Sequence, residues 1–94
     1  MIEKLQQVED RFEQIQQQLC DPQVVSDMSQ YQQLMKETKR LQPVTDMFRQ
    51  YKAALQTQEE ARAMLDDPEM RAFAEEELEL AKTQAETAWE ELKI

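Results

Sequence analysis

The stretch Met64–Lys82, MLDDPEMRAFAEEELELAK, contains a turn between two long helical patterns, and this turn decides the fold. Asp67 is of the residue type that accepts hydrogen bonds from the free amides at a helix start. Pro68 suits the first helical position, where its missing N–H costs nothing, and Glu69 suits the positive end of the helix dipole. The stretch therefore predicts that one helix ends near Leu65 and that the next begins at Pro68.

Apolar residues recur at helical spacing on both sides of this turn. After it they alternate in steps of four and three, which is a heptad pattern: Ala74, Leu78, Ala81, Ala85, Ala88 and Leu92. Before it runs a second apolar stripe: Met47, Phe48, Tyr51, Ala54, Leu55, Ala61, Met64 and Leu65. As helices, residues 43–65 and 68–93 would measure about 35 and 39 Å. We therefore expect them to pair as an antiparallel hairpin.

A first helix is predicted from Met1 to Leu19, since its apolar residues share one face: Ile2, Leu5, Val8, Phe12, Ile15 and Leu19. The pair Asp21-Pro22 ends this helix, because a residue before proline is disfavoured in the α region. A short irregular connection follows. We expect the first helix to bury its stripe against the hairpin formed by residues 43–65 and 68–93.

The middle helix is predicted to begin at Asp27, which forms a capping-box pattern with Gln30. Its apolar residues are Met28, Tyr31, Leu34, Met35 and Leu41. Pro43 then interrupts it, either as a kink or as the first residue of a new helix. The predicted fold is all-α: an elongated, antiparallel, coiled-coil-like three-helix bundle in which residues 1–94 form a single domain. An open coiled coil that dimerises is the alternative.

Composition excludes several classes of function. The chain has no glycine, so it has no glycine-rich phosphate loop, and no histidine, which is the commonest general base and metal ligand. Cys20 is the only cysteine, and we interpret it as a packed or incidental thiol. No apolar run is long enough to cross a bilayer. We therefore expect a cytoplasmic protein without catalytic residues, cofactor or metal, and with no membrane partner.

The net charge of −9 is unevenly distributed. Residues 1–58 carry eight acids and seven bases, whereas residues 59–94 carry twelve acids and four bases. The acidic part should be repelled by phosphate, so no DNA partner is expected. The stripe of glutamates at 75, 76, 77 and 79 is interpreted as a solvated face, because consecutive helical residues diverge by about 100°. The basic residues at 36, 39, 40, 49 and 52 also have the ordinary pattern of a solvated face.

Three segments carry a family resemblance: MIEKLQQVEDRFEQIQQQLCDPQVV (1–25), YQQLMKETKRLQPV (31–44) and AMLDDPEMRAFAEEELELAK (63–82). They resemble the N-terminal helical region of the bacterial peptide chain release factor 1 family, the class I factors for the stop codons UAA and UAG. The likeness covers essentially all 94 residues. The Leu-Asp-Asp-Pro-Glu-Met-Arg turn is its most specific piece.

The resemblance implies that this chain is the first domain of a larger, multidomain factor, cut within a helix at Ile94. Later domains would carry the Gly-Gly-Gln loop for peptidyl-tRNA hydrolysis and a Pro-x-Thr tripeptide that reads the stop codon. This domain would be auxiliary. It would face protein and rRNA at the stalk base of the large ribosomal subunit and influence the recycling GTPase. The alternative is a free-standing structural coiled coil or a chaperone-like adaptor.

Two groups are candidates for partner contacts. The turn residues Asp66, Asp67 and Pro68 are the first, because the tip of a hairpin projects furthest. The second is the basic group, Lys36, Lys39 and Arg40, whose charge suits RNA. The tripeptide Pro43-Val44-Thr45 also spells Pro-x-Thr, but it lies at a predicted helix start, and we interpret it as a chance match.

Overall fold

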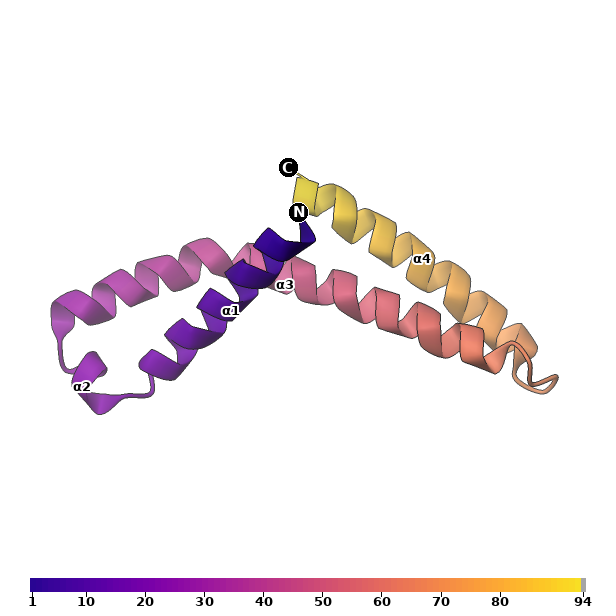
Figure 1. The fold of residues 1–94 in the computed structure, drawn as a ribbon, viewed down its shortest axis with the longest axis horizontal. Coiled ribbons are helices and arrows are strands. Elements are labelled where there is room, and N and C mark those ends of the chain that lie inside the picture. The colour runs from indigo at the N-terminus through magenta and orange to yellow at the C-terminus, as the bar shows by residue number, and fades with distance from the viewer. Residues whose placement is uncertain (94) are drawn as a thin grey trace. The chain divides into compact units, whose positions relative to one another are not determined.

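The computed structural model describes residues 1–93, and its regular elements there are four α-helices (Figure 1). They are α1 (Ile2–Gln18), α2 (Pro22–Val25), α3 (Met28–Met64) and α4 (Arg71–Lys93). The all-α prediction is confirmed. The chain divides into two compact units, Met1–Asp46 and Met47–Ile94, and α3 contributes one half to each. The single domain and the three-helix bundle stay predictions.

In the first unit, α1 packs against the N-terminal half of α3. Arg11 forms an ion pair with Glu37, and the Gln16 side chain donates a hydrogen bond to the Thr38 hydroxyl. The buried side chains of this unit are Leu5, Phe12, Ile15, Leu34 and Thr45. The predicted apolar face of the first helix is thus largely confirmed, although Ile2 is exposed. We expected α1 to pack against the hairpin of residues 43–65 and 68–93. Its contacts with Glu37 and Thr38 are instead with the part of α3 that precedes this hairpin in the sequence.

The connection after α1 is more regular than predicted, since it contains the one-turn helix α2. Asp21 is its N-cap, and the carboxylate accepts a hydrogen bond from the Gln23 N–H at 3.0 Å. Pro22 takes the first helical position, which its fixed φ suits. The Asp-Pro pair that we read as a helix stop therefore also acts as a helix start.

Helix α3 begins as predicted and continues further than predicted. The Asp27 carboxylate accepts a hydrogen bond from the Gln30 N–H at 3.2 Å, and the helix then runs for 37 residues through Pro43. A new helix at Pro43 is therefore wrong, whereas a kink there stays a prediction. Proline removes only the N–H that would bond to the Lys39 carbonyl. Both residues are exposed, so water can reach that carbonyl.

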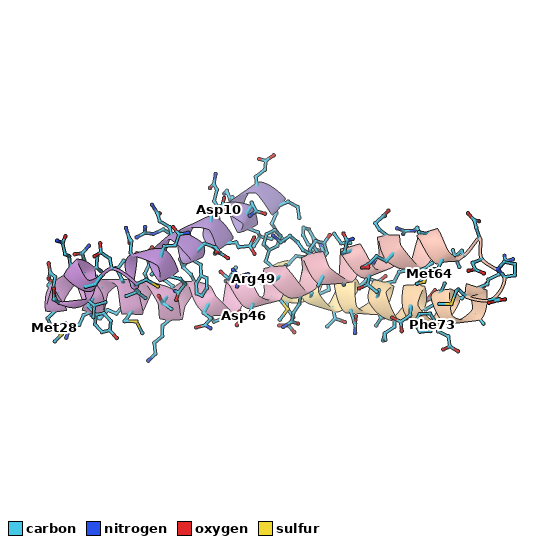
Figure 2. All side chains as sticks on the ribbon, turned by 90° about the horizontal axis from the view of Figure 1, so that it is seen from below. Asp10, Met28, Asp46, Arg49, Met64 and Phe73 are labelled. Carbon is cyan, nitrogen blue, oxygen red and sulfur yellow. The ribbon has the colours of Figure 1, made fainter. Side chains whose placement is uncertain are left out.

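In the second unit, α4 lies alongside the C-terminal half of α3 as an antiparallel hairpin, which both views show (Figures 1 and 2). The predicted heptad row of α4 is confirmed: its four alanines are buried and its two leucines are half-buried. At the end distant from the turn, the Tyr51 and Trp89 rings lie 5.0 Å apart between centroids. The apolar stripe of α3 differs from the prediction at one position. The predicted core residue Leu55 is 40% exposed, and Gln58, one turn further along, is buried instead.

The turn between α3 and α4 is longer than predicted, since α4 begins at Arg71 and not at Pro68. The Asp67 carboxylate accepts a hydrogen bond from the Glu69 N–H at 3.0 Å, as a cap would. The Asp67 carbonyl, however, accepts one from the Met70 N–H, which closes a tight turn. The first hydrogen bond of the next helical segment runs from the Ala74 N–H to the Met70 carbonyl. Asp67 therefore caps a turn that precedes the helix.

We predict that Ala81→Leu lowers the free energy of unfolding by about 1–3 kcal/mol, because a larger side chain overpacks the contact between α3 and α4. Ala81 is 1% exposed. The matched control is Ala72→Leu, the same replacement at an exposed position of α4, which should stay within about ±0.5 kcal/mol. Urea denaturation followed by circular dichroism at 222 nm measures both. Equal effects would show that the row is assigned wrongly.

Candidate interaction surfaces

The first candidate contact group occupies the turn between α3 and α4. Asp66, Asp67 and Pro68 are all exposed there. Asp67 is used within the turn, since its N–H donates to the Met64 carbonyl and its carboxylate accepts from the Glu69 N–H. These bonds order the backbone around the exposed Asp66 carboxylate. The turn therefore presents a negative charge on an ordered piece of backbone.

The second candidate group, Lys36, Lys39 and Arg40, is divided by the structure. All three side chains are exposed. Arg40 lines a shallow hollow with α1 residues, and its charge helps to lower the pKa of Glu37. Lys36 and Lys39 line a different hollow. The three cations are neighbours on α3, since Lys36 and Arg40 are four residues apart, but only the two lysines line the same hollow.

The Arg11–Glu37 pair is an electrostatic contact between α1 and α3. The Arg11 Nε donates to Glu37 Oε2 at 2.6 Å, and Nη2 donates to Oε1 at 3.0 Å, so the contact is bidentate. These hydrogen bonds are the main cause that lowers the pKa of Glu37, and burial opposes them. The Glu37 side chain is 25% exposed, so the pair is only partly screened by water.

A row of side chains on α3, which we call the outward stripe, was missed by the sequence prediction. It consists of Met28, Tyr31, Gln32, Met35, Lys36 and Lys39. The sequence lists Met28 and Met35 with Leu34 and Leu41 as the apolar residues of this helix and does not separate them. Leu34 is buried and Leu41 half-buried, whereas Met28 is 66% and Met35 is 39% exposed. Each pair is seven residues apart, and the leucine pair is the more buried of the two.

The outward stripe is hollowed. A depression of about 510 Å³ is lined by Tyr31, Gln32, Met35 and the two lysines. Met28 lies at the N-terminal end of α3, where Figure 2 labels it. The sequence contains one signal for this stripe. The first half of α3 has two pairs of apolar residues seven apart, Met28 with Met35 and Leu34 with Leu41, and the two pairs lie on different faces of the helix.

The tripeptide Pro43-Val44-Thr45 lies in the middle of α3. The Thr45 side chain is completely buried, and its hydroxyl has no hydrogen-bond partner within the described chain. A buried hydroxyl cannot touch a base. This geometry favours the interpretation of the tripeptide as a chance match.

The glutamate stripe on α4 faces solvent, as predicted: Glu75, Glu76 and Glu79 are exposed, and Glu77 is half-buried. Among residues 1–93, no three acidic, cysteine or histidine side chains are placed so that they could hold a metal ion. Cys20 is exposed, so it is not a packed thiol. Within the same residues, none of the helices combines the length and the apolar character that crossing a membrane requires.

Comparison with known proteins gives a consistent result. The PCRF domain matches residues 8–94. Peptide chain release factor 1 of Caldicellulosiruptor saccharolyticus is 40% identical over 97 aligned residues, which cover 100% of this chain and 27% of that protein. The same factor from Bacillus subtilis is 35% identical over the same coverage. The chain thus spans about a quarter of the length of these curated relatives. No solved structure matches it significantly.

We predict that Glu37→Gln destabilises the chain at neutral pH by about 0.5–1 kcal/mol, the value of a surface ion pair. The pKa of Glu37 is lower in the folded chain than its ordinary value of 4.5. Its contribution to stability is therefore fully present above that value and is lost as the pH falls through the folded pKa. Urea denaturation at pH 7 and pH 3 measures it. The difference between wild type and variant should be smaller at pH 3 than at pH 7, because the contribution of Glu37 is lost as the pH falls through its lowered pKa, and Glu76→Gln should show none at either pH.

Proposed function

We propose that this chain, which belongs to the PCRF domain family, is the auxiliary helical domain of a class I peptide chain release factor that acts at the stop codons UAA and UAG. The observation that carries the proposal is the match of the PCRF domain to residues 8–94. The similarity to peptide chain release factor 1 along the whole chain supports it. Because those relatives are much longer, hydrolysis and codon reading are assigned to parts of a longer factor.

The composition of the chain supports this division of labour. Without glycine it cannot contain the Gly-Gly-Gln loop, and the Thr45 of its Pro-x-Thr tripeptide is buried. Its own role is then positional. It is a cytoplasmic helical arm that places the factor against protein and rRNA at the stalk base of the large ribosomal subunit. There it influences the GTPase that recycles the factor.

Within this proposal, the turn at Asp66, Asp67 and Pro68 makes the ribosomal or GTPase contact. Its support is physical. The turn is exposed, its backbone is ordered by the hydrogen bonds of Asp67, and it carries negative charge that suits a basic protein surface. Lys36, Lys39 and Arg40 are the competing group, and only their charge suits rRNA.

A chimaeric release factor tests the function. The matching N-terminal region of Bacillus subtilis peptide chain release factor 1 is replaced by residues 1–94, or is deleted. The chimaera should release peptide from ribosomes stopped at UAA and UAG but not at UGA. The deletion variant in excess should still release peptide, whereas its GTPase-assisted turnover should fall. Loss of all release by a folded, ribosome-bound deletion variant would contradict the auxiliary role.

Thr45→Val in the same chimaera should leave the preference among UAA, UAG and UGA unchanged. Valine has nearly the shape of threonine, and it removes a buried hydroxyl that has no partner, so folding should not suffer. A changed codon preference would mean that the tripeptide reads the codon.

Asp66→Lys in the chimaera should slow multiple-turnover release in the presence of the recycling GTPase several-fold, while single-turnover release stays the same. The control is Glu76→Lys, which makes the same change of charge at an exposed position of α4. Both rates are measured with labelled peptidyl-tRNA on stopped ribosomes. If both substitutions slow turnover equally, the effect comes from net charge and not from contact at the turn.

A further inference from the structure

The outward stripe of α3 is unusual for a solvent-facing helix surface. Met28 and Met35 are 66% and 39% exposed, and half-buried Tyr31 lies between them. Methionine is common at binding surfaces because its flexible side chain adapts to the shape of a partner. These side chains form an apolar strip along about two turns of the helix, and Tyr31 and Met35 also line the depression of about 510 Å³.

Positive charge flanks this strip. Lys36 and Lys39 are exposed, and neither forms an ion pair within residues 1–93. The nearest acid in sequence, Glu37, is bound by Arg11 on the side that faces α1. Beyond Lys39, the next acid on the outward face is Asp46, two helical turns away, and at the other end of the stripe the Asp27 carboxylate accepts a hydrogen bond from the Gln30 N–H. In a chain with a net charge of −9, the stripe is therefore a local positive surface.

We propose that the outward stripe docks an acidic, amphipathic α-helix of a partner protein. The apolar residues recur at i, i+3 and i+7, which is the spacing that a helix laid along α3 would meet. Every polar group of the stripe can donate a hydrogen bond: the two ammonium groups, the Tyr31 hydroxyl and the Gln32 amide. Carboxylates beside an apolar row complement such a surface. The proposal stands apart from the assignment to a release factor.

The same features disfavour a nucleic acid as the occupant. Affinity for nucleic acid grows with the number of phosphates that cations neutralise, and this face offers two lysines. The acidic remainder of the chain adds repulsion. Single-stranded RNA is bound by stacking bases on flat side chains, and within the stripe only the half-buried Tyr31 has a flat ring, whereas the two methionines have none. A protein helix uses both the apolar row and the lysines.

The test is a nuclear magnetic resonance titration of the 15N-labelled 94-residue chain. The probe is a synthetic helical peptide of about 18 residues with leucine at alternating steps of three and four and glutamate on both flanks. Amide signals of residues 28–39 should shift on addition of this peptide. The same peptide with lysine in place of every glutamate should bind at least tenfold more weakly. A uridine-rich RNA 12-mer is titrated in parallel.

Two charge variants locate the binding. Lys36→Glu/Lys39→Glu should weaken binding of the acidic peptide by about tenfold, through the loss and reversal of two surface contacts. Lys82→Glu/Lys93→Glu makes the same change of net charge on α4 and should leave the affinity nearly unchanged. Circular dichroism should show equal helix content in both variants, because all four lysines are exposed.

Several results would overturn the proposal. One is RNA that shifts residues 28–39 while the acidic peptide does not. Another is equal weakening by the two double variants, and a third is the absence of any shift with the acidic peptide. Shifts of the same residues that depend on protein concentration without peptide would assign the stripe to a second copy of the chain. None of these outcomes bears on the chimaera, so the two proposals fail separately.

Discussion

The hairpin of the second unit depends on the close approach that alanine permits between α3 and α4. Within the described residues, six alanines are buried in this unit: Ala54, Ala61, Ala74, Ala81, Ala85 and Ala88. A methyl group removes little apolar area from water, so each contact contributes little by itself. The hairpin is therefore stabilised by the length of its contact and by a few large side chains. Among these, Phe48 and the Tyr51–Trp89 pair lie at the end distant from the turn.

Charge in this chain is arranged so that different elements present opposite signs. The acids of α4 face solvent, and the turn exposes Asp66. On α3, the bidentate bond from Arg11 neutralises the one acid between the two exposed lysines, Glu37. This ion pair attaches α1, and it also leaves the outward stripe positive. The Arg11–Glu37 contact thus helps to hold α1 on α3, and it also removes a negative charge from beside the two lysines.

The sequence was informative where one apolar row had no competitor. The steps of four and three on α4 allow a single buried face, and the structure buries that face. The first half of α3 offered two rows, Leu34 with Leu41 and Met28 with Met35. Spacing does not tell which row a partner helix covers. The exposed Met pair, and with it the outward stripe, could therefore not be separated from the core.

The ends of the helices are harder to predict, because an Asp-Pro pair or a proline occurs in more than one kind of local structure. An Asp-Pro pair can cap a helix or close a turn, since both need a carboxylate that accepts an N–H. At Asp21 it starts a helix, and at Asp67 it precedes one by several residues. Likewise Pro43 suits a first turn, yet it is accommodated in the middle of α3 because its neighbours are exposed. The local hydrogen bonds follow from these residues, whereas the element that they begin depends on the neighbouring chain.

The position of Trp89 gives the chain a built-in spectroscopic reporter. It is the only tryptophan, and its ring lies against Tyr51 across the hairpin. Its fluorescence emission therefore follows the separation of α4 from α3, whereas helix content is summed over both units. Both units share the single helix α3. If this helix makes the two units unfold together, tryptophan fluorescence and helix content should change at the same denaturant concentration. A gap between the two transitions would be a direct measure of how independently the units unfold.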